Sequence, residues 1–293
     1  VVPNGFNFTY FMPKAEKYIK DGVFGEVKHI DAAFSSSLVD LFQGIPLSES
    51  EDHTFKPLAS TWSDPQKGGG YAWGQLSHMF GGVFKVTGLE AEKVFCFSLL
   101  SPTKVDYTDA ISVRFTNGAT GAFSGCAYVP KGFGGTFYIT VHGTKGNLYL
   151  DMEIKRERLL IRLNDGKEIS DEIGEGDGTT SYGTKAPLDV FVDICLGKEV
   201  ENHANAEIGL KTVKVLDAVY RSMKSENSEK SFKSITLQGE EASGGQKTIS
   251  YATGGSFTYE DKINYTEDMI VSGLEIKAVA KLKDQLEPLG PVT

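Results

Sequence analysis

The chain has 293 residues, 40% of them hydrophobic and 24% charged, which is enough for a substantial buried core. The formal net charge of −9 offers no basic surface of the kind that attracts nucleic acid or anionic membranes. No segment approaches the ~20 apolar residues of a membrane span, and the N-terminus lacks a secretory signal layout. The expected partners therefore include neither nucleic acid nor membrane. Three widely spaced cysteines (Cys96, Cys126 and Cys195) favour reduced thiols and a cytoplasmic location.

The first 70 residues predict a strand, a helix and a long loop. We expect a strand over Val1–Phe8, then a helix that starts at Pro13 and ends before Gly22. The apolar residues at the spacing of one buried helix face are Ala15, Tyr18 and Ile19. Residues 43–70 are polar and rich in Ser, Pro and Gly, which predicts a long surface loop, and such loops often carry function.

Between Lys93 and Ile173 the hydrophobic period becomes two, which predicts β-strands. Asn117-Gly118 and Asn164-Asp165-Gly166 supply hairpin turns between these strands. The alternating apolar residues are Ile111, Val113, Phe115, Phe137, Ile139, Val141, Leu148, Leu150, Met152, Leu159, Ile161 and Leu163. Four or five consecutive strands joined by hairpins predict an antiparallel meander, which commonly packs helices on one face only.

Two helices are expected after the strands. One runs from Pro187 to Leu196 and ends at Gly197, and the other runs from about Asn205 to Lys224 with Asn205 as its N-cap. The apolar stripe of the second helix consists of Ile208, Val215, Leu216, Val219 and Met223. Strands followed by helices indicate an α+β fold, whose uncovered sheet face needs a partner or a polar surface.

The last 70 residues have a different composition. Residues 224–257 are rich in Ser, Gly, Lys and Glu and predict a linker. A final amphipathic helix is expected to open at Thr266, with Ile270, Leu274, Ala278 and Leu282 on one face.

The glycine-rich stretch from Gly68 to Gly82 is the strongest candidate for a functional site. Its three consecutive glycines suit a loop pressed against a ligand or another segment. If residues 74–86 form a helix, the core-facing residues are Leu76, Met79, Phe80, Val83 and Phe84. Gln75, His78 and Gly82 then share the opposite side, where glycine would leave an open surface. A neutral imidazole at His78 could exchange a proton with a substrate hydroxyl. The alternative is a structural histidine.

Aromatic residues beside these glycines are candidates for substrate contacts. Trp62, Tyr71 and Trp73 could stack on a sugar ring, although aromatic residues are also common in cores. Gln75 and Tyr10 complete the set of expected substrate-binding residues.

Neither a metal site nor a dinucleotide site is expected within this chain. His29, His53, His142 and His203 have no carboxylate or cysteine at metal-ligand spacing. The Gly-x-Gly-x-x-Gly fingerprint is not found in the sequence, since the glycines of residues 174–178 lack its spacing.

Five segments, in order, resemble the Gfo/Idh/MocA oxidoreductases. They are residues 7–27, the stretch from Trp62 to His78, Asp109–Gly118 with its Asn-Gly turn, His142–Gly146, and Asn205–Ser222. The resemblance covers about residues 1–232 and implies the family's C-terminal α/β domain, with residues 233–293 as an extension. It also implies a large, predominantly antiparallel mixed sheet with helices packed on one face.

The resemblance further implies a catalytic position and a cofactor. Members of the family carry a lysine in their Rossmann domain, then an aspartate and a histidine in the second domain. His78 matches the histidine, but the aspartate position falls on Gly74 and a further acidic position falls on Gly81. The lysine-bearing segment lies outside these residues. NAD or NADP is therefore expected to bind through a Rossmann domain that this chain does not contain.

The leading hypothesis is the substrate-binding part of an NAD(P)-dependent sugar or polyol dehydrogenase, with His78 as its catalytic residue. Oxidation of a secondary hydroxyl is the expected reaction, and a homodimer or homotetramer through the open sheet face is the expected assembly. The main alternative is a non-catalytic binding or assembly subunit without a cofactor domain. A lectin-like carbohydrate-binding module is a third hypothesis, but a glycine loop beside a histidine suits a cleft better.

Overall fold

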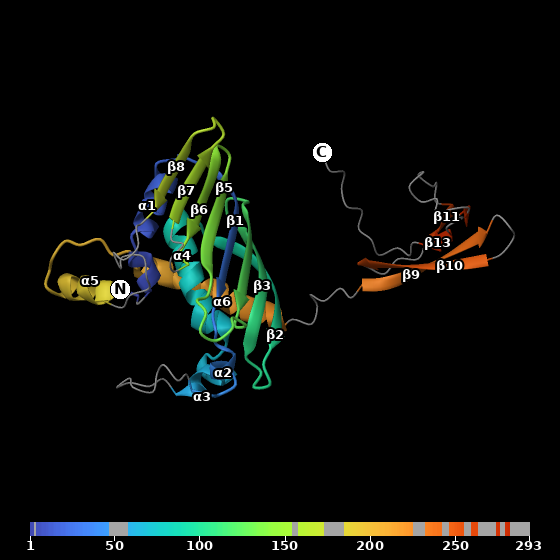
Figure 1. Ribbon diagram of the computed structural model, residues 1–293, viewed down its shortest axis with the longest axis horizontal. Coiled ribbons are helices and arrows are strands. Elements are labelled where there is room, and N and C mark those ends of the chain that lie inside the picture. The colour runs from blue at the N-terminus through green and yellow to red at the C-terminus, as the bar shows by residue number, and fades with distance from the viewer. Residues whose placement is uncertain are drawn as a thin grey trace. The chain divides into compact units, whose positions relative to one another are not determined.

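A computed structural model describes residues 1–2, 4–46, 58–153, 158–172, 185–224, 232–241, 246–254, 259–262, 274–275 and 279–281. The chain divides into two compact units, Val1–Ser225 and Glu226–Thr293. This division lies slightly before the boundary expected at residue 232. The candidate site belongs entirely to the first unit, which contains the large sheet in Figure 1.

Eight strands form the sheet of the first unit, in the order β2-β3-β4-β1-β5-β6-β7-β8. The strands are β1 (Val27–Ser35), β2 (Ala91–Leu100), β3 (Asp106–Phe115), β4 (Thr120–Cys126), β5 (Phe137–Gly143), β6 (Gly146–Asp151), β7 (Arg158–Leu163) and β8 (Glu168–Glu172). Only the pairing of β1 with β4 is parallel. The expected α+β class with a large, predominantly antiparallel mixed sheet is confirmed.

The expected meander of four or five consecutive strands is present as β5–β8, but it does not continue from β4 to β5. Strand β1 lies between β4 and β5 and separates the antiparallel run β2–β4 from the run β5–β8. Ile30 and Ala32 of β1 are buried beneath the helices, so this central position completes the core-facing surface of the sheet. A hairpin pattern identifies neighbouring strands along the chain, but it carries no signal for a distant strand inserted between two hairpins.

The described residues of the first unit form six α-helices, which are α1 (Phe11–Lys20), α2 (Val39–Phe42), α3 (Ala59–Trp62), α4 (Ser77–Thr87), α5 (Lys185–Cys195) and α6 (Ala206–Lys224). Of these, α1, α4 and α6 pack on one face of the sheet, as expected, while α2 and α3 lie beyond its end (Figure 1). Short 3₁₀ helices lie at η1 (Gly5–Phe8) and η3 (Pro65–Lys67), and a π-helical segment, η4 (Ala72–Leu76), precedes α4. No helix in the described ranges combines the length and hydrophobicity that a membrane crossing needs.

Helix α6 follows the sequence expectation closely. The Asn205 side chain accepts a hydrogen bond from the Ile208 amide at 3.0 Å, which confirms the N-cap. Val215, Leu216 and Val219 are buried, while Ile208 and Met223 pack at the margin of the core. The amphipathic stripe therefore places α6 on the sheet, where it packs mainly against β2.

The expected strand over Val1–Phe8 is wrong, because Gly5–Phe8 forms the 3₁₀ helix η1. The Asn7 side chain is fully buried and donates hydrogen bonds to the carbonyls of Gly81 and His203 at 3.3 and 3.2 Å. These tertiary contacts fold the segment over α4, and such contacts routinely override local propensity.

The second unit contains strands where a linker and a helix were expected. The described strands are β9 (Phe232–Glu241), β10 (Gln246–Gly254), β11 (Tyr259–Lys262), β12 (Leu274–Glu275) and β13 (Val279–Lys281). The expected linker is wrong at β9 and β10, which pair in antiparallel register. Ile235, Leu237, Ile249 and Tyr251 alternate with polar residues, and the Ser and Gly content masked this period of two. The helix expected from Thr266 is interrupted by β12 and β13, and its remaining residues lie outside the described ranges.

We predict that Leu216→Ala lowers the free energy of unfolding by about 2–5 kcal/mol, because it leaves a cavity between α6 and the sheet. Val213→Ala on the same helix is the control, since Val213 is 52% exposed. Urea denaturation of both variants measures the effect. Equal stabilities would contradict the packing role of Leu216.

Candidate functional site

The candidate site is built around a helix that is buried on nearly every side. From Met79 to Thr87, every residue of α4 is buried, and the helix contacts α1, α6 and the sheet. The five expected core residues, Leu76, Met79, Phe80, Val83 and Phe84, are all buried. The helix therefore has little exposed surface, and only its beginning can form part of a site.

The glycine loop before η4 is pressed tightly against its surroundings. Gly70 has a φ of +113°, and a side chain there would meet Asp106 and the Tyr220 hydroxyl. At Gly69, a Cβ atom would lie 2.4 Å from the Trp62 carbonyl oxygen. The loop thus needs glycine for close approach to protein atoms.

Three consecutive residues at the start of η4 are each held by a different element. The Tyr71 hydroxyl donates to the Phe34 carbonyl of β1 at 3.0 Å. The Ala72 amide donates to Asp106 Oδ2 of β3 at 2.6 Å. The Trp73 amide donates to the Tyr220 hydroxyl of α6 at 3.3 Å. The first turn is therefore fixed from three sides.

Two buried carboxyl groups lie behind this turn and were not proposed as site residues from the sequence. Asp106 also accepts a hydrogen bond from the Tyr220 hydroxyl at 2.6 Å, and Asp109 accepts one from the Ser98 hydroxyl at 2.5 Å. Burial and the charge of Asp106 raise the pKa of Asp109 to about 8. A signal for Asp109 did exist, since it shares the strand parity of the core residue Ile111.

The Tyr220 hydroxyl is a fixed donor within this arrangement. Burial and the neighbouring Asp106 charge both raise the Tyr220 pKa, so the phenol stays protonated. Its ring stacks on the Trp73 ring with centroids 5.6 Å apart and an interplanar angle of 12°.

The His78 side chain lies against two phenylalanine rings. Its imidazole makes edge contacts with Phe6 of η1 and Phe34 of β1, at centroid distances of 5.8 and 6.5 Å. Burial lowers the His78 pKa to about 4. The imidazole is therefore neutral at pH 7 and suits hydrogen bonding to a hydroxyl better than holding a charge.

The glycines of α4 are closed by packing, which corrects the expectation of an open surface at Gly82. A side chain at Gly82 would meet Met12 and Ile139, whereas one at Gly81 would lie 2.2 Å from the Asn4 side-chain amide. The Trp62 ring occupies the corresponding space over Gly74. Both positions where the family pattern carries an acidic residue are therefore covered by other side chains.

The remaining expected substrate-binding residues lie in different surroundings. Tyr71 is completely buried, Trp62 and Trp73 are partly buried against the core, and Gln75 is partly exposed within η4. Tyr10 is 42% exposed and contacts Lys14 and Phe11. The structure thus gathers Trp62, Tyr71, Trp73 and Gln75 around the glycine loop, and it places Tyr10 in a separate set of contacts on α1.

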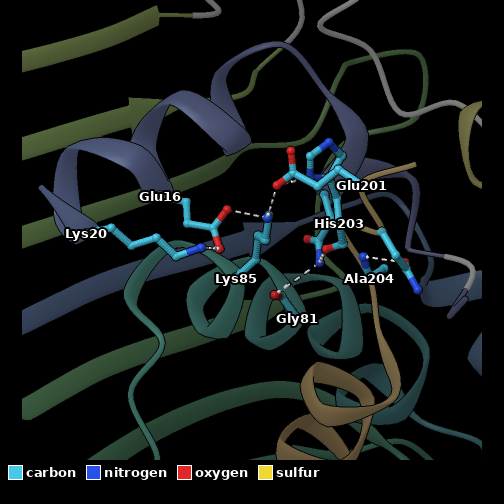
Figure 2. Close-up of polar contacts among 9 residues, drawn as sticks. Glu16, Lys20, Gly81, Lys85, Glu201, His203 and Ala204 are labelled. Atoms are coloured by element: carbon cyan, nitrogen blue, oxygen red, sulfur yellow. Dashed lines mark hydrogen bonds and ion pairs between the residues drawn. The ribbon is translucent and has the colours of Figure 1, made fainter. Parts of the chain in front are cut away.

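A buried ionic cluster fixes the far end of α4 (Figure 2). The Lys85 side chain is 4% exposed, contacts Glu16, and lies 3.9 Å from Glu201. Lys20 pairs with Glu16 at 2.7 Å. Burial raises the Glu16 pKa, but hydrogen bonds and charges from Lys20 and Lys85 outweigh burial and leave it below its usual value. This cluster ties α1 and the segment before α6 to α4.

The residues present do not fit a dinucleotide, because no glycine fingerprint follows a strand in this sequence. Within the described part of the chain, no three His, Cys, Asp or Glu residues form a group that could hold a metal ion. Asp31 instead joins His29 and His142 on the uncovered sheet face, with each histidine Nε2 3.2 Å from a carboxylate oxygen.

This sheet, the covering helices and the glycine loop before a buried histidine helix identify a class of oxidoreductase domain. The family described as "Oxidoreductase family, C-terminal alpha/beta domain" (GFO_IDH_MocA_C) matches residues 16–230. The chain belongs to this Gfo/Idh/MocA oxidoreductase family and contains its C-terminal domain. No curated protein matches the chain in sequence.

Solved structures of similar fold include several sugar-related enzymes. Levoglucosan dehydrogenase in complex with NADH and levoglucosan is 19% identical, with a TM-score of 0.54 over 74% of this chain and 63% of that chain. Aldose-aldose oxidoreductase from Caulobacter crescentus is 18% identical, with a TM-score of 0.54 over 74% of this chain and 59% of that chain. An oxidoreductase from Sinorhizobium meliloti is 16% identical, with a TM-score of 0.55 over 76% of this chain and 61% of that chain. This chain therefore spans about three fifths of their length.

We predict that His78 makes the protein less stable in acid. The unfolded chain takes up a proton near the usual histidine pKa of about 6.5, whereas folded His78 stays neutral down to about pH 4. Stability is therefore lost as pH falls through this window. Between pH 7 and 5, wild type should lose about 1–2 kcal/mol more than His78→Gln in urea denaturation. Parallel pH profiles for the two proteins would contradict the buried, neutral imidazole.

Proposed function

We propose that this chain is the substrate-binding part of an NAD(P)-dependent dehydrogenase that oxidises a secondary hydroxyl of a sugar or polyol. The observation that carries the proposal is the neutral, largely buried His78 next to a rigid glycine loop, in a chain of an oxidoreductase family. Structural neighbours that act on levoglucosan and on aldoses support a sugar-like substrate. Three free cysteines are compatible with a reducing, cytoplasmic location.

The proposed role of His78 is to orient the reacting hydroxyl and to exchange its proton. A neutral imidazole can accept the hydrogen bond of a hydroxyl, and burial strengthens such a bond by excluding water. We propose that Gln75, Trp73 and Trp62 contact the sugar ring. Tyr71 would support these residues from the core, and Tyr10 would contribute from the start of α1. Because the described residues do not fit a dinucleotide, NAD(P) would have to be held by another domain.

We expect His78→Ala to weaken sugar binding by about tenfold, which corresponds to about 1.4 kcal/mol. Isothermal titration with levoglucosan, glucose and inositol measures this affinity. His142→Ala is the matched control, because His142 lies on the uncovered face of the sheet, opposite the helices. Equal affinities for His78→Ala and the control, or no binding of any sugar by wild type, would reject the proposed site.

A second proposal concerns assembly through the uncovered sheet face. Phe97 and Leu99 of β2 are 50% and 54% exposed, and Phe97 pairs across the ladder with Ala110 of β3. Exposed apolar side chains beside small ones make a flat, apolar strip, which is typical of protein interfaces. We propose a homodimer or homotetramer that buries this strip.

We expect Phe97→Asp to shift the protein to a smaller assembly, because it places a charge in the apolar strip. Leu188→Asp on α5 is the control, since Leu188 is 60% exposed and lies on a helix instead of the sheet. Sedimentation velocity distinguishes the species. A monomeric wild type, or a shift caused equally by the control, would contradict this interface.

The alternative function is a non-catalytic binding or assembly subunit. One observation favours it: Trp62 and Asn4 occupy the space next to Gly74 and Gly81, where the family pattern carries acidic residues. A catalytic test decides between the two functions. NAD(P)-dependent oxidation of a sugar by the protein from its natural source, lost in His78→Ala, would support the dehydrogenase.

A further inference from the structure

Asp106 and Tyr220 form a clamp that joins β3 and α6 to the start of η4. Asp106 is completely buried and uses both carboxylate oxygens, one for the Ala72 amide and one for the Tyr220 hydroxyl, each at 2.6 Å. The same hydroxyl accepts the Trp73 amide. The clamp therefore fixes two consecutive backbone amides that a helix start leaves without internal partners.

The clamp lies where the helix departs from regular α geometry. Residues Ala72–Leu76 are π-helical, and α4 begins immediately afterwards at Ser77. A π-turn contains more residues than an α-turn, so the side chains after it are rotated relative to an uninterrupted α-helix. Such segments are rare and occur frequently at functional sites. Strong hydrogen bonds to the first amides offset the cost of this geometry.

His78 is the second residue after the π-helical segment, so its direction depends on that segment. From Met79 onward, α4 is held by its buried packing and by the Lys85 cluster, so any change in the π-helical segment must be taken up at Ser77 and His78, which join the two. In its present position the imidazole makes edge contacts with the Phe6 and Phe34 rings. If the start of the helix relaxed to α geometry, the His78 ring would leave this position.

We propose that Asp106 and Tyr220 are positioning residues that hold the π-helical turn and thereby aim His78. The inference rests on the proposed function for its biological meaning, since an aimed imidazole matters for a substrate hydroxyl. Its structural content is independent of any substrate. Gly70 is also required for the clamp, because a side chain at this position would collide with both Asp106 and Tyr220.

Tyr220→Phe is the decisive variant. It removes only the hydroxyl and keeps the ring that stacks on Trp73. NMR of histidine-labelled protein then reports on His78 directly. In wild type we expect contacts of the His78 ring with Phe6 and a pKa of about 4. In the variant we expect loss of these contacts and titration closer to the usual value of about 6.5.

Ser222→Ala is the matched control on the same helix. The Ser222 hydroxyl accepts the Cys96 amide at 2.9 Å, so this variant also loosens α6 from the sheet but leaves the clamp intact. We expect its His78 signals to match wild type. Asp106→Asn is the second clamp variant and decides the matter if Tyr220→Phe does not fold, because Asn keeps an acceptor for Ala72.

Unchanged His78 signals in the folded clamp variant, or an equal change in Ser222→Ala, would overturn the proposal. Sugar titration of the same proteins separates the two hypotheses. A His78 ring that moves in Tyr220→Phe, in a protein that binds no sugar, would leave the clamp standing and reject the proposed function. Sugar binding in a Tyr220→Phe protein whose His78 ring does not move would reject the clamp and leave the proposed function standing.

Discussion

The burial of helix α4 on almost all sides is the constraint on which this structure depends. A helix surrounded by α1, α6, η1 and the sheet must satisfy every polar group it carries and must leave room for the side chains of these neighbours. Gly81 and Gly82 allow neighbouring side chains to approach the helix closely. The buried Lys85 ammonium has acidic partners because an unpaired charge there would be costly. Both the chemistry and the shape of the candidate site follow from this position.

The same burial explains how the chain departs from its family's pattern. An acidic residue at Gly81 would collide with Asn4, and a side chain at Gly74 would collide with the Trp62 ring. The Asn4 amide and the Trp62 ring of α3 thus fill the space beside these two glycines. Fewer charges near His78 make its surroundings less polar, in keeping with its lowered pKa. Gly74 and Gly81 are therefore each matched by a side chain that needs the space a larger residue would take.

Much of the first unit could be predicted from periodicity, while the clamp could not. The stripe of α6 and the alternation at Ile111, Val113 and Phe115 are local patterns, and the structure confirms them. The insertion of β1 into the sheet, the fold of η1 and the bonds of Asp106 join residues far apart in sequence, where spacing gives no signal. His78 could be predicted as a site residue because a histidine beside a run of glycines is a local pattern in the sequence. Tyr220 lies within the helix expected over residues 205–224, but outside its apolar stripe, and local spacing gives no signal for its contact with Asp106.

A histidine with a low pKa restricts the chemistry that the site can perform. Such an imidazole is a weak base, so it accepts a hydrogen bond from a hydroxyl more readily than it takes up the proton. A dry, aromatic setting also favours a neutral ground state. The geometry around His78 therefore suits holding and orienting a neutral hydroxyl, which is the role proposed for this residue.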